Sequence, residues 1–232
     1  MTRLTPGPLQ TDAASGLSYR LMPAQPAGAK RLLVLLHGVG SNELSVAGLA
    51  DGAGEDTLAV LVQGPLQLGP QQFAWFQVAF TANGPRIEPK QAEHSRQALV
   101  QFLAALQTQH GIAATQTVIA GFSQGGIMSA SVALTSPESV AGFALLSGRI
   151  LPEIEPLLAS QARLSTLQGF VGHGEHDSKL PVDWAHRAHA WLDTLNVTHT
   201  LNLYPIDHSI SAPMHADFLQ WRNDLSQPQC EG

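Results

Sequence analysis

Short apolar segments alternate with segments of helical pattern along this chain. Continuous apolar runs without polar alternation are typical of strands that are buried on both faces. Five such runs lie at residues 31–36, 58–62, 117–120, 141–146 and 167–171, and a sixth segment of strand type lies at 198–204. The predicted helices are 93–109, 124–134, 181–195 and a last one capped by Ser211. The alternation predicts an α/β fold with a mostly parallel central sheet and helices on both faces. We expect one domain over residues 1–232, without a large cap domain.

Composition and charge exclude several classes of function. The chain has 232 residues, a net charge of −6 and scattered Lys and Arg, so no basic stripe for nucleic acid is present. The apolar runs are too short to span a membrane, so we expect no stable membrane insertion. Met1–Met22 lacks the pattern of a signal peptide. The single cysteine, Cys230, allows no internal disulfide, which favours a cytoplasmic protein.

The segment Gly121-Phe122-Ser123-Gln124-Gly125 has the pattern G-x-S-x-G. It follows a predicted strand and opens a predicted helix, which is the context of a nucleophile elbow. Glycines around Ser123 allow the close backbone approach that a sharp turn needs. The alternative is an ordinary serine that caps a helix. We interpret Ser123 as a nucleophile, which needs a base from elsewhere in the chain.

The base and the acid follow from chain order, which runs Ser, Asp or Glu, His in this type of site. His208 follows the last predicted strand and is the expected general base, the alternative being an exposed loop histidine. Asp177 lies in the loop after the strand 167–171 and is the expected partner of His208. Its alternative role is a charge at a helix N-terminus. Glu175 and Asp207 are rival acids, although Asp207 directly precedes His208 and is badly placed to orient that ring.

An oxyanion hole needs two backbone N–H groups. We expect Gln124, which follows the nucleophile, and Val39, in the glycine-rich loop after the strand 31–36, to supply them. That loop lacks the Gly-Lys-Ser/Thr ending of a P-loop and the third glycine of a dinucleotide site. Histidine pairs at 173/176 and 186/189 have spacings that zinc could use, but no accompanying motif, so we expect no metal.

These residues resemble the small carboxylesterase/phospholipase family of α/β-hydrolases, which includes acyl-protein thioesterases. The resemblance implies an α/β-hydrolase fold, a triad of Ser123, Asp177 and His208, oxyanion donors at Val39 and Gln124, and no cofactor. The segments that carry it are Leu35–Gly40, Ala74–Phe76, Gly121–Gly126, His173–Asp177 with Leu180-Pro181, and His208-Ser209.

The family also suggests roles outside the triad. The loop continues Ser41-Asn42-Glu43, where acyl-protein thioesterases usually have an aspartate, so the chain looks closer to bacterial esterase-like members. The stretch 64–89 reads as long and irregular. In the family a comparable segment borders the acyl pocket, so Trp75 and Phe76 either bind substrate or pack against the sheet edge.

The sequence therefore predicts a serine hydrolase that cleaves small carboxylic esters through an acyl-enzyme. The alternatives are an acyl-thioesterase or lysophospholipase on the same triad, then a peptidase or amidase, and then an inactive binding protein. A homodimer is compatible with the sequence.

Overall fold

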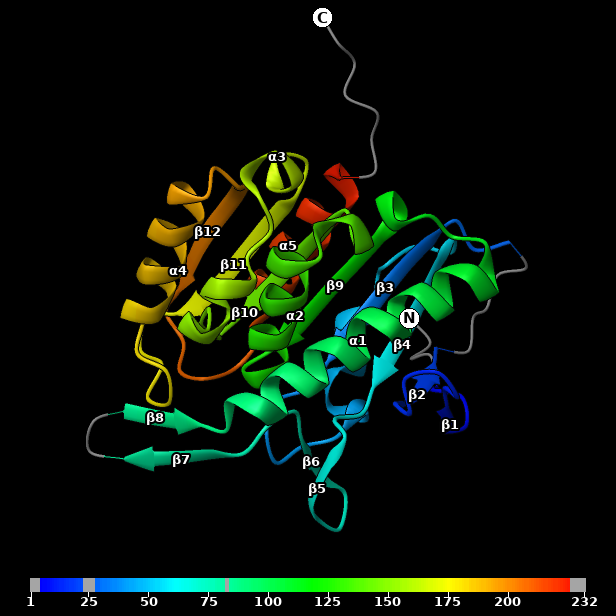
Figure 1. The fold of residues 1–232 in the computed structure, drawn as a ribbon, viewed down its shortest axis with the longest axis horizontal. Helices are drawn as coiled ribbons and strands as arrows, with labels where there is room; N and C mark the ends of the chain where they lie inside the picture. Colours follow the sequence, from blue (N-terminus) through cyan, green and yellow to red (C-terminus); the bar gives the residue numbers. More distant parts are fainter. Residues whose placement is uncertain (1–4, 23–27, 82–83, 226–232) are drawn as a thin grey trace, which may run out of the picture.

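A computed structural model describes residues 5–22, 28–81 and 84–225, so Cys230 and the start of Met1–Met22 lie outside the described residues. An eight-stranded sheet forms its centre, in the order β1-β2-β4-β3-β9-β10-β11-β12 (Figure 1). The six strands β4, β3, β9, β10, β11 and β12 are parallel to one another. At one edge, β2 pairs antiparallel with β4, and β1 pairs antiparallel with β2. The predicted mostly parallel sheet is thus confirmed.

The sheet strands coincide closely with the apolar runs of the sequence. Their bounds are β1 Gln10–Thr11, β2 Ser18–Leu21, β3 Arg31–Leu36, β4 Thr57–Val62, β9 Thr117–Phe122, β10 Gly142–Leu146, β11 Gln168–Gly174 and β12 Thr198–Tyr204. All six predicted strands are present, and the structure extends β9 and β11 further toward their carboxyl ends. The extensions carry Phe122 and His173-Gly174 to the edge where ligand sites form in such sheets.

Helices cover both faces of the sheet (Figure 1). One face packs against α1 Pro89–His110, α2 Gln124–Thr135, the short α3 Gln161–Leu164 and α4 Asp183–Thr194. The other face packs against the 3-10 helix η1 Glu43–Ala50 and against α5 Ala212–Asp224. Ser211 caps α5, as predicted, because its side chain accepts a hydrogen bond from the Met214 N–H. Short 3-10 helices complete the connections: η2 Ala114–Gln116, η3 Pro137–Ser139 and η4 Pro152–Leu157.

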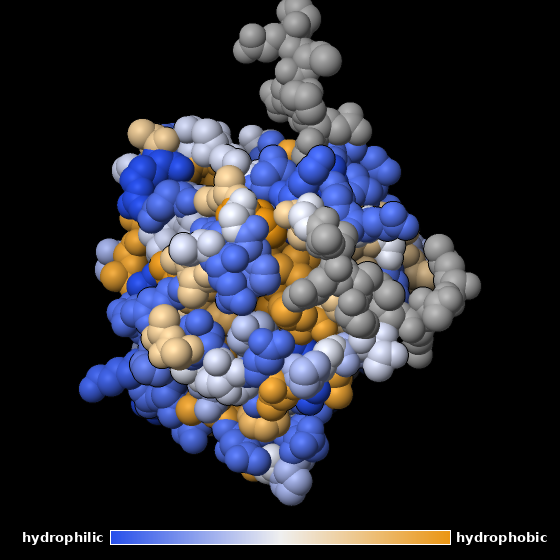
Figure 2. Space-filling view, turned by 90° about the vertical axis from the view of Figure 1, so that its right-hand side faces the viewer, coloured by the Kyte–Doolittle hydropathy of each residue, from blue (hydrophilic) through white to orange (hydrophobic). Residues whose placement is uncertain are grey.

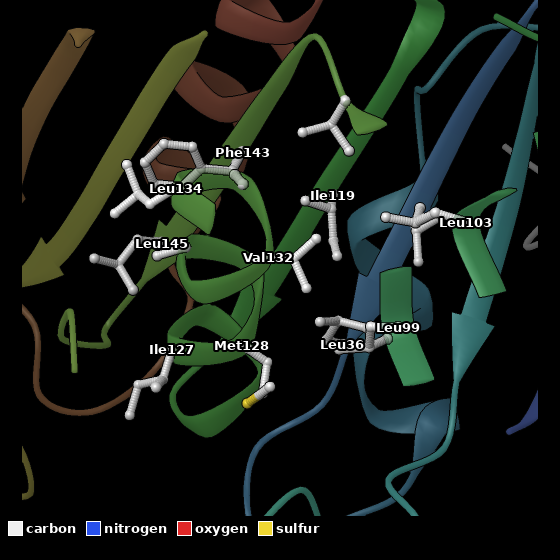
Figure 3. Close-up of a cluster of buried hydrophobic side chains, with 14 of the residues drawn as sticks. Leu36, Leu99, Leu103, Ile119, Ile127, Met128, Val132, Leu134, Phe143 and Leu145 are labelled. Carbon is white, nitrogen blue, oxygen red and sulfur yellow. The ribbon is translucent and has the colours of Figure 1, made fainter. Parts of the chain in front are cut away.

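Two apolar cores lie on opposite faces of the sheet, because successive strand residues point to opposite sides. In β3, Leu32, Val34 and Leu36 belong to one core, whereas Leu33 and Leu35 belong to the other. Figure 3 shows the first core, in which side chains of α1 and α2 meet those of β3, β9 and β10. This packing fixes α2 against the sheet and so holds the start of α2 in place.

The stretch 64–89 differs from the irregular segment that the sequence indicated. It forms two antiparallel hairpins, one of β5 Leu66–Gly69 with β6 Gln72–Ala74, the other of β7 Val78–Thr81 with β8 Gly84–Ile87. Both hairpins project from the lower edge of the sheet in Figure 1. Strands this short carry almost no periodic signal, which explains why the sequence pattern did not reveal them.

The surface on the β1–β2 side of the molecule is mixed in polarity. Figure 2, which views the β1–β2 side of the molecule, shows hydrophilic side chains interspersed with hydrophobic ones. Among the described helices, none is both long and apolar enough to cross a bilayer.

Candidate active site

Ser123 occupies a sharp turn between β9 and α2. Its backbone has φ 53° and ψ −117°, a sparsely populated conformation for a residue with a side chain. Such a conformation costs about 1–3 kcal/mol and persists only where the surroundings impose it. Here the Ser123 N–H donates to the Leu146 carbonyl at 2.8 Å, and its own carbonyl accepts from the Ile127 N–H at 3.0 Å. The turn presents the hydroxyl at the carboxyl end of the sheet.

Two glycines allow this turn to exist. A Cβ on Gly121 would lie 2.2 Å from the Gly125 carbonyl carbon. A Cβ on Gly125 would lie 2.1 Å from the Leu36 carbonyl oxygen. Both contacts are with backbone atoms, which cannot rotate away. The glycines of the motif are therefore required by the close approach of β9, α2 and β3.

The three residues that the sequence selected as a triad come together at this turn. The Ser123 hydroxyl lies 3.0 Å from Nε2 of His208, and Nδ1 of His208 lies 2.7 Å from Oδ2 of Asp177. Asp177 is buried, and its Oδ1 also accepts hydrogen bonds from the N–H groups of Lys179 and Leu180. With Nδ1 donating to Asp177, Nε2 is left to accept the serine proton.

The rival acids lie elsewhere. The Asp207 carboxylate accepts from the backbone N–H groups of Ser178 and His208, and these hydrogen bonds lower the pKa of Asp207. Asp207 thus orders the loop that carries His208 without touching the imidazole ring. Glu175 is exposed, and its backbone N–H donates to the Tyr204 carbonyl at 2.7 Å, away from the His208 ring.

Hydrogen bonds order the loop that follows β3. Nδ1 of the buried His37 donates to the Gly38 carbonyl at 2.7 Å, while Nε2 accepts from the Gly64 N–H at 2.9 Å. Burial lowers the pKa of His37, which keeps the ring neutral and able to accept. Gly38 lies against the nucleophile, since a Cβ there would be 3.3 Å from the Ser123 Cβ.

The two expected oxyanion donors lie beside Ser123. Val39 and Gln124 line the same cavity as the serine. Neither backbone N–H donates a hydrogen bond to another residue in the part of the chain that the structure describes. Free N–H groups at this position are what a developing oxyanion requires.

The cavity at the triad has a volume of about 650 Å³ and is largely apolar, within the size range of small-molecule sites. Phe76 lines it, together with Val78 and Ile87 of the β7–β8 hairpin. Trp75 is not among its lining residues, which corrects the expectation that both aromatics border substrate. Trp75 is fully buried instead, and its indole N–H donates to the His37 carbonyl at 2.9 Å.

The Gln124 side chain connects the nucleophile turn to this wall. Its Oε1 accepts from the Trp75 N–H at 2.8 Å, and its Nε2 donates to the Phe76 carbonyl at 2.7 Å. Sequence reasoning assigned a role only to the Gln124 backbone. The Gln124 side chain bonds to residues that precede it by 49 and 48 positions, so no local sequence pattern could reveal this contact.

Two cations also line the cavity, and the sequence analysis did not single out either. Arg149 follows β10, and Lys179 follows Asp177 in the loop after β11. Their positions follow from the same rule as the triad, because loops after parallel strands meet at the carboxyl edge of the sheet.

One group of residues, away from the triad, has the geometry to hold a metal ion. His189, Asp193 and His199 place one ligand atom each within 4.8 Å of one another. His199 is the second residue of β12, at the amino end of the strand, whereas the triad lies at the carboxyl ends of the strands. The two imidazoles also contact each other directly, with 2.6 Å between Nδ1 of His189 and Nε2 of His199.

A nucleophile elbow at the carboxyl edge of a mostly parallel, doubly covered sheet defines an α/β-hydrolase. The sequence matches the phospholipase/carboxylesterase family over residues 22–221, and the chain belongs to that family. Acyl-protein thioesterase 1 of Kluyveromyces lactis is 28% identical over 174 residues, covering 69% of this chain and 75% of the relative.

Solved structures show the same fold. A carboxylesterase from Mesorhizobium loti superposes with a TM-score of 0.80 at 24% identity, covering 95% of this chain and 99% of its own. Esterase PE8 gives a TM-score of 0.75 at 25% identity, with 97% and 100% covered. The carboxylesterase of Bacillus cereus gives 0.76 at 18% identity, with 90% and 94% covered. Membership of the phospholipase/carboxylesterase family makes the chain a carboxylesterase-type hydrolase, and its fold agrees with this.

Proposed function

We propose that this protein hydrolyses carboxylic esters through an acyl-enzyme on Ser123. The observation that carries the proposal is the continuous hydrogen-bonded series Ser123–His208–Asp177 at the base of an apolar cavity. The cavity has room for an acyl chain, and the strained turn aims the nucleophile into it.

The proposed first step is attack of the Ser123 oxygen on the ester carbonyl while Nε2 of His208 takes the serine proton. The negative charge on the carbonyl oxygen is stabilised by the N–H groups of Val39 and Gln124. His208 then gives its proton to the departing alkoxide, which leaves as the alcohol. The acyl group remains on Ser123.

In the second step, His208 takes a proton from water, and the resulting hydroxide attacks the acyl-enzyme. Collapse of this intermediate releases the carboxylic acid and returns the proton to Ser123. Asp177 holds Nδ1–H throughout and stabilises the imidazolium that forms in each step. Water is the co-reactant that balances the reaction.

An acyl thioester is the second candidate substrate, because the Kluyveromyces lactis relative is named an acyl-protein thioesterase. The same series of proton transfers releases a thiol in place of the alcohol. A panel of aryl esters with graded acyl length, measured beside an acyl thioester, separates the two by kcat/KM.

Substitution of Ser123 tests the proposal itself. Ser123→Ala should abolish ester hydrolysis while the thermal unfolding midpoint stays close to that of the wild type. Ser41→Ala is a matched control, since Ser41 lines the cavity but contacts β6 through its backbone alone. Ester hydrolysis that persists in Ser123→Ala would exclude Ser123 as the nucleophile.

A further inference from the structure

The cavity at the triad carries charge of the opposite sign to the rest of the molecule. The chain has a net charge of −6, yet no Asp or Glu is among the described residues that line the cavity. Arg149 and Lys179 both line it. Because a low-dielectric cavity screens charge poorly, these cations favour an anionic group in the substrate.

Arg149 is the unusual member of the pair. Its residue is only 5% exposed, yet its side chain forms no hydrogen bond or salt bridge with any residue that the structure describes. Glu153 attracts the guanidinium only through space. Burying a charge without a directly bonded partner is costly, and buried cations are normally paired. Arg222 shows the usual arrangement, since its buried Nη2 donates to the Ala53 carbonyl and the Thr57 hydroxyl.

The polypeptide around Arg149 fixes its backbone beside the nucleophile. Ser147 has φ 48°, an unfavourable value for a residue with a side chain. Gly148 packs so closely that a Cβ there would lie 3.1 Å from the Ser123 carbonyl oxygen. The residue after Gly148 is therefore held next to the nucleophile turn.

An aromatic ring holds the guanidinium without neutralising it. The Arg149 Cζ lies 4.8 Å from the centroid of Trp184, in the first turn of α4. A cation–π contact of this kind orients the guanidinium but leaves its N–H fork free for a planar anion. Arg187 contacts the same ring at 4.9 Å but does not line the cavity.

We propose that Arg149 binds an anionic oxygen group of the substrate, so that this enzyme prefers esters bearing a carboxylate or phosphate near the scissile bond. The inference rests on the proposed function at Ser123 and narrows its substrate class. Lys179, which is exposed, adds a weaker attraction at the same cavity.

The test compares matched pairs of esters in the wild-type protein. Three anionic esters differ in their anionic group, carboxylate or phosphate, and in whether that group lies on the acyl or the alcohol side of the ester. They are an aryl hemiglutarate, an acyloxybenzoate and an acyloxyphenyl phosphate. Their neutral partners are the aryl valerate, the methyl ester of the acyloxybenzoate and the unsubstituted phenyl ester. We expect kcat/KM to favour the anionic member in at least one pair.

Arg149→Met keeps the apolar stem of the side chain and removes its charge. Charge-assisted hydrogen bonds contribute about 1.5–3 kcal/mol, so the anionic-to-neutral ratio of kcat/KM should fall about 10- to 150-fold. Most of the change should appear in KM for the anionic member, and Arg149→Lys should restore part of the preference. Arg187→Met should leave the ratio unchanged, because it removes the other cation on Trp184 without altering the cavity.

Several outcomes would overturn the inference. One is Ser123-dependent hydrolysis of the neutral esters with no anionic member preferred. Another is an equal loss on both members of a pair in Arg149→Met, which would show a structural role. Arg149→Gln serves as the second variant if Arg149→Met does not fold. If neither member of any pair is hydrolysed in a Ser123-dependent way, the proposed function fails first and this inference fails with it.

Discussion

At the scale of single residues, the hydrogen bonds to Asp177 determine which nitrogen of His208 carries the proton. Oδ1 of Asp177 accepts from two backbone N–H groups, so Oδ2 is committed to Nδ1 of His208. In Asp177→Asn, the same backbone donors would hold the amide oxygen and turn the NH₂ group toward His208. The ring would then carry its proton on Nε2 and could not accept one from Ser123.

We therefore expect Asp177→Asn to lower kcat by about 10⁴-fold without loss of folded protein, the size of effect known for a wrong histidine tautomer. Asp207→Asn is the control, because Asp207 contacts the loop of His208 but not its ring. Steady-state kinetics with an aryl ester measure both variants. A decrease in kcat of less than tenfold in Asp177→Asn would exclude Asp177 as the group that orients His208.

Some residues of the site could be predicted from the sequence, and others could not. Chain order and strand ends selected Ser123, Asp177 and His208, because each follows an apolar run that is visible in the sequence. Trp75 was misplaced because an aromatic residue beside a cavity and one behind its wall have the same sequence pattern. Arg149 was missed because a solvated and a buried arginine look alike in sequence.

At the scale of elements, the contact between α2 and β3 depends on the lack of a side chain at Gly125. A methyl group there would overlap the backbone of both Leu36 and His37. We expect Gly125→Ala to destabilise the fold by more than about 4 kcal/mol, or to prevent folding. Gly48→Ala in η1 is the control, since beyond its immediate chain neighbours and the backbone of its own helix no atom lies within 4 Å of its Cβ position. Chemical denaturation measures both, and equal stability would contradict the packing.

The Gln124 side chain joins α2 to the segment between β6 and β7. Gln124→Ala leaves the Trp75 N–H and the Phe76 carbonyl without partners, at a cost of about 1–3 kcal/mol each. Because Phe76 is then free to shift, we expect kcat/KM to fall about 10- to 100-fold. The exposed Gln97→Ala is the control. Unchanged kinetics in Gln124→Ala would show that the wall does not depend on this side chain.

The elements also show where prediction from sequence ends. The buried parallel strands were visible because each is a continuous apolar run between polar segments. β1, β2 and the two hairpins were not visible. They are two to four residues long and lack such a run. Their existence depends on pairing with neighbours, which a local pattern does not encode.

At the scale of the whole molecule, two buried histidines couple stability to pH. Burial lowers the pKa of both His37 and His173 below the ordinary value of 6.5. The unfolded chain therefore binds more protons than the folded chain just below pH 6.5. The stability that these two neutral histidines contribute is fully present above pH 6.5 and is lost as the pH falls below that value.

We expect the free energy of unfolding to be constant from pH 8 to 7 and to decrease below pH 6.5. At pH 5.5 each of these histidines accounts for at most about 1.4 kcal/mol of the loss. The exposed His94→Gln is the control and should leave this decrease in place, because His94 does not contribute to the pKa of either buried ring. Denaturant titrations across this range measure the effect, and a stability that increases toward pH 5.5 would contradict it.

The proposed mechanism requires that Ser123 becomes acylated during turnover. A fluorophosphonate, which mimics the tetrahedral intermediate, tests this claim when labelled protein is digested and its peptides are sequenced by mass spectrometry. We expect one adduct, on Ser123, that is absent from Ser123→Ala and much slower to form in His208→Ala. An adduct on another residue, or unchanged labelling of Ser123→Ala, would contradict it.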